Sequence, residues 1–339
     1  MRTNFRLVIL SCVIALAIGE GLLRWLDIGD PPAFEKDPHY GYLMQPNQSV
    51  STRGSRFHIN REGFRGVDFA WRKPEGVFRI AFAGDSITYG GGSVPETDLF
   101  VNQVASRLSS LTHNKIEAIN LSAPGWGISN IAAYLKTHGL PEVDLLVWVV
   151  PAADFRRPKM SLEEYGFPTK KPWSRITYLA SVATWKVYNE VYNRGRQWWF
   201  IESNETSGEA QAVRDQNVQT LVHVLSDSMA KGNRVMVAFV PSQHGNDTDP
   251  EDLAVYRLAA DSVSIPCLDL GPAFQRERFD KLFFDGMHLT SLGHKVAADA
   301  IVGFLTKQFF TGTEAKLTGE INTRCQSTGE VTDASNRAK

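Results

Sequence analysis

The chain is poor in cysteine and has no excess of charge of either sign. Its three cysteines, Cys12, Cys267 and Cys325, are widely spaced, which excludes a disulfide framework and a cysteine-based metal site. The formal net charge is −1, so the sequence does not predict a nucleic-acid-binding surface, which needs clustered Lys and Arg. Glycines 90–92 are not followed by Gly-Lys-Ser/Thr, which excludes a phosphate-binding loop of that type.

One long hydrophobic run is present, and it opens the chain. Arg2 and Arg6 precede an apolar stretch over residues 7–18, which is the pattern of an export signal. We predict an uncleaved signal anchor over residues 1–26, with the rest of the chain outside the cytoplasm as a single-pass protein of the cell membrane. A cleaved signal peptide and a lipidated Cys12 remain alternatives.

Residues 77–310 alternate between short apolar runs and segments with helical spacing. This order predicts an α/β fold with three layers, in which a mostly parallel sheet is flanked by helices on both faces. The predicted strands are 77–83, 116–121, 144–152, 234–242 and 265–270. The predicted helices are 99–111, 128–140, 212–230, 251–261 and 291–309.

Three segments do not follow this alternation of apolar runs and helical segments. Residues 27–76 are rich in turn-forming residues, and we predict a lead-in segment with a small hairpin, packed on the main domain. Residues 155–208 are aromatic-rich and are interpreted as an insertion over the edge of the sheet that carries the site. Residues 311–339 are polar without apolar periodicity, and we predict a disordered tail.

Ser86 follows the first predicted strand of the sheet, in the sequence Gly84-Asp85-Ser86. Such a tripeptide is by itself a common turn or helix cap, so a nucleophilic serine needs a base elsewhere in the chain. Among eight histidines only His288 has a suitable context, because Asp285 precedes it by three residues just before the last helix. Asp285 can hold the imidazole while its second nitrogen serves as a base. A metal site would need a third ligand that the sequence does not suggest, and no cofactor is expected.

The combination resembles the SGNH (GDSL-type) hydrolase family over about residues 77–310. The resemblance rests on Gly84-Asp85-Ser86, on Asn120-Leu121 followed by Gly125, and on Asp285 with His288. It implies a flavodoxin-like sheet, a catalytic set of Ser86, His288 and Asp285, and an oxyanion hole formed by the backbone N–H groups of Ser86 and Gly125. The sequences INREGFRG and KPEGVFRIAFAGDS resemble the exported, membrane-anchored bacterial branch of the family.

One block departs from the family pattern. The family has Gly-x-Asn-Asp after the third strand, with the Asn side chain donating to the oxyanion, whereas this chain has Pro151-Ala152-Ala153-Asp154. Ala153 offers no side-chain donor, and the loss of one such donor costs about 2.7–4 kcal/mol of activation barrier in other enzymes. The departure leaves open whether another group replaces the Asn.

The leading hypothesis is an exported serine esterase that hydrolyses an O-acetyl ester on a carbohydrate through an acyl-enzyme on Ser86. Acyl transfer to a hydroxyl, hydrolysis of a lipid ester and a non-catalytic binding or assembly role remain alternatives, the last favoured by Ala153. Arg156 and Arg157 are interpreted as a solvated pair, with binding of an acidic substrate group as the alternative. Aromatic side chains in the insertion are interpreted as helix packing or membrane contact, with sugar stacking as the alternative; they are Trp173, Trp185, Trp198, Trp199 and Phe200.

Overall fold

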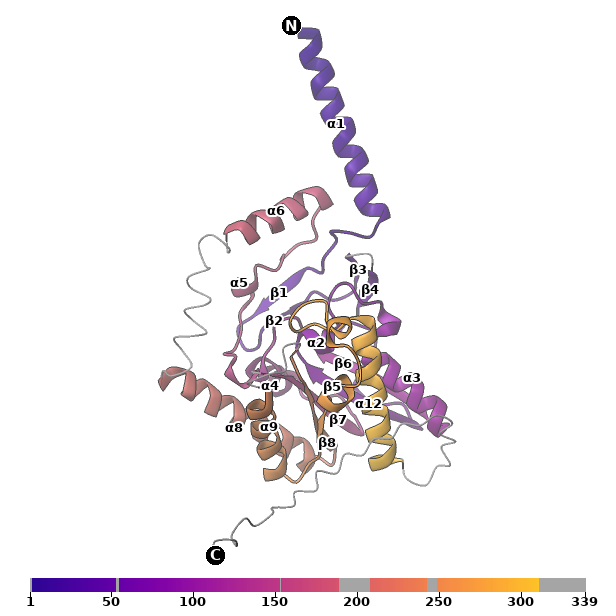
Figure 1. Cartoon of the computed structure of the whole chain (residues 1–339), viewed down its shortest axis with the longest axis vertical. Helices are drawn as coiled ribbons and strands as arrows, with labels where there is room; N and C mark the ends of the chain where they lie inside the picture. Colours follow the sequence, from indigo (N-terminus) through magenta and orange to yellow (C-terminus); the bar gives the residue numbers. More distant parts are fainter. Residues whose placement is uncertain (1, 53–54, 153, 189–207, 243–248, 311–339) are drawn as a thin grey trace, which may run out of the picture.

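A five-stranded parallel sheet forms the centre of the protein (Figure 1). The computed structural model describes residues 2–52, 55–152, 154–188, 208–242 and 249–310. The strands of this sheet are β5 (Val77–Gly84), β6 (Lys115–Ser122), β7 (Leu145–Pro151), β8 (Arg234–Val240) and β9 (Cys267–Asp269). They lie in the order β6-β5-β7-β8-β9, which is the flavodoxin-like order. The strand order reverses between β5 and β7, and ligands of such sheets bind beyond the carboxyl ends of the strands at that point.

Both faces of the sheet are buried, which explains the continuous apolar runs in its strands. In β7, all seven residues are buried. Leu145, Val147 and Val149 belong to one hydrophobic cluster, and Leu146, Trp148 and Val150 belong to the other. Side chains alternate between the faces of a strand, so a strand covered on both sides is apolar at every position.

Helices cover the two faces and complete the three layers. On one face lie α3 (Phe100–Thr112) and α12 (Ser291–Phe309), which share a cluster with Val147 of β7. On the other face lie α4 (Ile128–His138), α8 (Gly208–Ala230) and α9 (Asp249–Ser262), which share a cluster with Trp148 of β7. The predicted fold class, a mostly parallel sheet with helices on both faces, is confirmed.

Two β-hairpins precede the sheet in the chain. The first pairs β1 (Phe34–Asp37) with β2 (Gly41–Met44), and the second pairs β3 (Gln48–Thr52) with β4 (Ser55–Ile59). Their buried side chains, including Tyr42, belong to the same hydrophobic cluster as α4 and α8. The hairpins therefore pack on the face of the sheet that α4 covers, and β2 contacts the turn that follows β6, as described below.

Short elements connect the layers and shape the edge near Ser86. They are α2 (Ser86–Tyr89), the 3₁₀ turns η1 (Glu96–Asp98) and η2 (Asp154–Arg156), α5 (Leu162–Tyr165), α6 (Arg175–Tyr188), α10 (Gly271–Phe274) and α11 (Phe279–Leu282). Of the predicted insertion, α5 and α6 are described. Trp198, Trp199 and Phe200 lie outside the described residues, and so does the predicted tail.

Helix α1 (Arg2–Trp25) projects from the body of the protein (Figure 1). Its segment Phe5–Trp25 has a mean hydropathy of 2.1 and is unburied throughout, and in the described part of the chain no other helix is long and apolar enough to cross a membrane. The apolar run recognised in the sequence therefore continues as one helix to a length that spans a bilayer. This is consistent with a signal anchor or a signal peptide.

Candidate active site

Ser86 lies where β5 ends and the short helix α2 begins. The Asp85 side chain caps this turn, because its Oδ1 accepts a hydrogen bond of 2.9 Å from the backbone N–H of Ile87. Gly84 is required by close packing: a Cβ at this position would lie 2.1 Å from Oγ1 of Thr88. The sequence Gly-Asp-Ser therefore makes a tight strand-to-helix turn that presents Ser86 at the carboxyl edge of the sheet.

His288 lies in the loop before α12, and Asp285 organises that loop. Oδ1 of Asp285 accepts hydrogen bonds from the backbone N–H groups of Met287, at 2.9 Å, and His288, at 2.7 Å. Its Oδ2 lies 2.8 Å from Nδ1 of His288. The other ring nitrogen of His288, Nε2, lies 2.9 Å from Oγ of Ser86. The structure thus brings together three predicted residues, two of which are separated by 202 positions in the chain.

The surroundings of Asp285 keep its carboxyl group ionised. Partial burial raises the pKa of Asp285, but hydrogen bonds from the backbone of His288 and Met287 outweigh this and hold the pKa below its ordinary value. An ionised carboxylate accepts a hydrogen bond from Nδ1–H, which keeps the proton on Nδ1 and leaves the lone pair of Nε2 directed at Ser86. Phe284 stacks on the imidazole, with ring centroids 5.6 Å apart and an interplanar angle of 13°.

Gly125 lies in the turn after β6, on the same edge of the sheet as Ser86, since Ser122 of β6 is in register with Gly84. Its φ of +79° lies in the left-handed region, and a Cβ there would lie 2.4 Å from the ring of Tyr165. Only glycine fits both constraints. The first hairpin supports the turn on each side: the Tyr42 hydroxyl donates to the Pro124 carbonyl at 2.6 Å, and Nε1 of Trp126 donates to the Tyr42 carbonyl at 2.8 Å.

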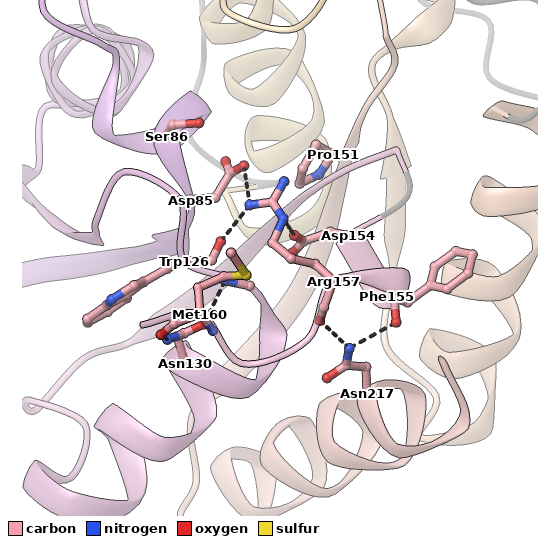
Figure 2. A network of polar contacts seen from close by, with 12 residues as sticks. Asp85, Ser86, Trp126, Asn130, Pro151, Asp154, Phe155, Arg157, Met160 and Asn217 are labelled. Carbon is pink, nitrogen blue, oxygen red and sulfur yellow. Dashed lines mark hydrogen bonds and ion pairs between the residues drawn. The ribbon is translucent and has the colours of Figure 1, made fainter. Parts of the chain in front are cut away.

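Ala153 lies outside the described residues, so the departure from the family pattern remains a statement about sequence. The residues that follow it are described. The side chain of Asp154 is 1% exposed, and Nε of Arg157 lies 3.4 Å from its Oδ1. Nη1 of Arg157 also donates to the Trp126 carbonyl at 3.0 Å and lies 3.5 Å from Oδ2 of the fully buried Asp85. Figure 2 shows the guanidinium between these three groups.

Arg157 therefore connects the ends of three strands behind Ser86. Asp85 follows β5, Trp126 belongs to the turn after β6, and Asp154 follows β7. Two buried carboxylates would repel each other without a cation between them. The prediction that Arg156 and Arg157 form a solvated pair is wrong, because Arg156 also pairs with a buried carboxylate, that of Asp252, at 2.8 Å.

The pKa values in this cluster reflect burial and mutual interaction. Burial raises the pKa of Asp154 to about 7, with Arg157 opposing the rise and the Asp85 carboxylate adding to it. Burial alone would lower the pKa of Arg157, but the carboxylates of Asp154 and Asp85 raise it above its ordinary value. Arg157 is thus held as a cation, and its charge limits the rise in the pKa of Asp154.

Two asparagines secure the loop that carries Arg157 (Figure 2). Nδ2 of Asn217 donates to the carbonyls of Phe155, at 2.9 Å, and Arg157, at 2.7 Å. Asn130 pairs with both backbone groups of Met160, at 2.8 and 3.0 Å. The sequence analysis missed Asn130 and Asn217. The available signal was weak: each is one polar residue within a predicted helix, and a polar side chain needs hydrogen-bonding partners when it is buried.

Comparisons with known proteins give matches only among solved structures. No family model and no curated protein sequence matches the chain. An acetylxylan esterase from Geobacillus stearothermophilus is 15% identical, with 67% of this chain and 93% of that chain covered and a TM-score of 0.44. A lipase/acylhydrolase from Enterococcus faecalis is 16% identical, with 68% and 96% covered and a TM-score of 0.42.

A third similar structure is an alpha/beta hydrolase enzyme from the metagenome of Lake Arreo, Spain. It is 14% identical, with 67% of this chain and 94% of that chain covered and a TM-score of 0.43. The solved structures to which this chain is similar thus include hydrolases and esterases. All three are at most 16% identical to this chain, with TM-scores below 0.5.

Proposed function

We propose that the protein is a serine hydrolase that acts on carboxylic esters. The observation that carries the proposal is the chain of contacts from Asp285 through His288 to Ser86, with successive distances of 2.8 and 2.9 Å. These are the distances that a nucleophile, its base and the group that orients the base require. The side chain of His288 is 30% exposed, so a substrate can approach from solvent.

The reaction that this geometry fits proceeds in two steps. His288 Nε2 takes the proton from Ser86 as Oγ bonds to the ester carbonyl carbon, and His288 then gives that proton to the departing alcohol. Water attacks the acyl-enzyme after losing a proton to Nε2, the bond to Oγ breaks, and Ser86 regains its proton as the carboxylic acid leaves. Such positioned proton transfer contributes typically about 10²–10⁴-fold to the rate.

The negative oxygen that forms in each step needs hydrogen-bond donors. We assign this role to the backbone N–H groups of Ser86 and Gly125, because the residues lie on turns at the same edge of the sheet. Ala153 supplies no side-chain donor. Arg157 compensates indirectly in this proposal: it contacts Asp85 and the Trp126 carbonyl, and so holds the two turns that carry the N–H groups in one arrangement.

The substrate and location are proposed from the sequence. An O-acetyl group on a carbohydrate outside the cytoplasm suits an esterase that is tethered by α1, since Arg2 and Arg6 direct the chain after α1 to the far side of the membrane. A lipid ester is a second candidate, favoured by the membrane-crossing length of α1. Acyl transfer would use the same acyl-enzyme, with a sugar hydroxyl in place of water.

Covalent labelling with a fluorophosphonate tests the proposal. The full-length protein in detergent should be labelled on Ser86, located by peptide mass spectrometry, and should release acetate from 4-nitrophenyl acetate and an acetylated oligosaccharide. The exposed serine Ser110 should stay unlabelled. Cleavage of long-chain but not acetyl esters would assign a lipid substrate. Neither labelling nor hydrolysis would identify a non-catalytic protein.

Conservative replacement of Arg157 tests the compensating role. Lysine keeps the charge but cannot donate to the Trp126 carbonyl while it contacts both carboxylates, so the turns should shift. A shift of about 1 Å can cost 10²-fold, and we expect Arg157→Lys to lower kcat by about that factor with little change in KM. The matched control is Arg156→Lys, for which kcat within about twofold of wild type is expected, because lysine keeps a positive charge opposite Asp252, and Arg156 pairs with that residue rather than with the turns at Asp85 and Trp126. Wild-type kcat in Arg157→Lys would contradict the role.

A further inference from the structure

Helix α6 starts against the membrane-spanning segment. Oε2 of Glu20 in α1 accepts hydrogen bonds from the backbone N–H groups of Arg175, at 3.0 Å, and Ile176, at 3.2 Å. Arg175 in turn donates to the Leu23 carbonyl at 2.8 Å. Figure 1 shows α6 running across the direction of α1, near the end of α1 that joins the body. Glu20 thus fixes where the first turn of α6 lies along α1.

The contact places α6 at a definite depth. The apolar segment ends at Trp25, five residues after Glu20. With a rise of about 1.5 Å per residue, Glu20 lies roughly 8 Å inside that end of the helix. Ile176 lies at the same level, since its Cδ1 would be 3.5 Å from a Cβ at Gly19. Helices that lie in a membrane interface are buried to about 5–10 Å, which is the same range.

The sides of α6 differ in character. One side packs on the body through Trp185. Its indole lies so close to Gly166, the residue after Tyr165, that a Cβ added at Gly166 would be 2.9 Å from Nε1 of the indole. The side of α6 that faces away from Trp185 is formed by positions 176, 180, 183 and 187, given about 100° of rotation per residue. These are Ile176, Ala180, Ala183 and Val187, all of them apolar and none buried, with Val187 63% exposed. We call these four residues the apolar stripe.

A polar side lies between the apolar stripe and the body. It carries Thr177, Ser181 and Thr184, whose hydroxyls donate to backbone carbonyls three residues earlier at 2.9, 2.7 and 2.8 Å. Those groups therefore need no water to satisfy their donors, as a helix at a lipid boundary requires. Trp173, just before the helix, is 83% exposed, and indole rings are enriched at membrane interfaces.

The charges of α6 suit a phospholipid surface. Its sequence RITYLASVATWKVY contains no acidic residue and two basic ones, Arg175 and Lys186. A helix without acidic side chains is not repelled by anionic headgroups, and the Lys186 side chain can extend to them from the edge of the apolar stripe. The depth of α6 along α1, the exposure of its apolar stripe and its lack of acidic residues therefore all favour a lipid bilayer as the surface that α6 contacts.

We propose that α6 lies flat in the interface of the bilayer that α1 spans, with the apolar stripe toward the acyl chains. The proposal is independent of the hydrolase assignment and rests on α1 being in the membrane. It gives the domain a second membrane contact, so the body is held in one orientation instead of rotating about a single tether. The body side of α6 is also connected to the site, because Trp185 lies against Gly166 and the neighbouring Tyr165 lies against the turn at Gly125.

Spin labels on α6 test the proposal in the full-length protein. The native cysteines are first replaced (Cys12→Ser, Cys267→Ala, Cys325→Ser), and one nitroxide is placed by Ala183→Cys or, as the matched control on the polar side, Ser181→Cys. The protein is reconstituted into vesicles of phosphatidylcholine and phosphatidylglycerol. Collision with oxygen, which concentrates in lipid, and with a water-soluble nickel chelate is then measured at each label.

We expect the ratio of oxygen to nickel collisions to be several-fold higher at Ala183 than at Ser181. A second pair, Ala180→Cys against Thr177→Cys, should repeat the difference if either first variant folds poorly. Equal, nickel-rich ratios at both members of each pair would overturn the proposal. So would spin–spin broadening at Ala183 that disappears on dilution with unlabelled protein, because it would assign the apolar stripe to a second copy of the chain.

Discussion

Replacing Ser86 with alanine should abolish ester hydrolysis, with kcat falling by about 10⁶-fold, as in serine hydrolases that lose their nucleophile. The reason is the position of Oγ, 2.9 Å from Nε2 of His288, where it can lose a proton and bond to the substrate carbonyl. Alanine removes the oxygen and leaves the Asp85 cap of α2 in place. Acetate release from 4-nitrophenyl acetate by purified protein measures the effect.

The control for this variant is Ser110→Ala, which changes an exposed serine on α3 and should keep wild-type activity. Two measurements of folding separate loss of catalysis from loss of structure: Ser86→Ala should retain the circular dichroism and the thermal unfolding midpoint of the wild type. Hydrolysis by folded Ser86→Ala at close to the wild-type rate would refute the assignment of the nucleophile.

Replacing Asp285 with asparagine should lower kcat by about 10⁴-fold while the loop keeps its shape. The amide oxygen of asparagine can still accept the hydrogen bonds from the backbone of Met287 and His288. The amide nitrogen, however, donates a hydrogen bond to Nδ1 of His288. The imidazole then carries its proton on Nε2, which faces Ser86, and can no longer accept the proton of that serine.

The pH dependence distinguishes this explanation from simple loss of structure. The pKa of Asp285 lies below its ordinary value, so its carboxylate is ionised at neutral pH and can hold the Nδ1 proton of His288 in a hydrogen bond. The residual activity of Asp285→Asn should rise toward high pH, where hydroxide replaces the missing base. Asp280→Asn changes an exposed carboxylate five positions earlier and should leave the profile unchanged. An unaltered kcat in Asp285→Asn would exclude Asp285 from the site.

The sheet could be predicted from the sequence because its strands are covered on both faces. The run 144–152 matches β7 (Leu145–Pro151) to within a residue at each end, and the predicted last helix matches α12 (Ser291–Phe309). The lead-in segment was harder, since its strands have four or five residues each and carry little periodicity. A single hairpin was expected there, and the structure has two.

The proximity of Ser86 and His288 could be predicted because parallel strands bring their carboxyl ends to one edge of the sheet. Arg157 could not be predicted in the same way. Its partners Asp85, Trp126 and Asp154 follow three different strands, and a pair of arginines in a loop normally indicates a solvated segment. Only the burial of the two acids, which depends on how the turns pack, shows that a cation is needed among them. The position of Ala153 stays a sequence-based observation.

The separation of 202 positions between Ser86 and His288 has a consequence for biosynthesis. The nucleophile emerges from the ribosome early, while its base emerges almost at the end of the domain, just before α12. A chain interrupted during synthesis or clipped by a protease before residue 285 has a serine with no partner to activate it. Under the proposed function, an unfinished or truncated molecule is therefore harmless to acetylated compounds in the cytoplasm, and activity arises only after the complete domain has folded.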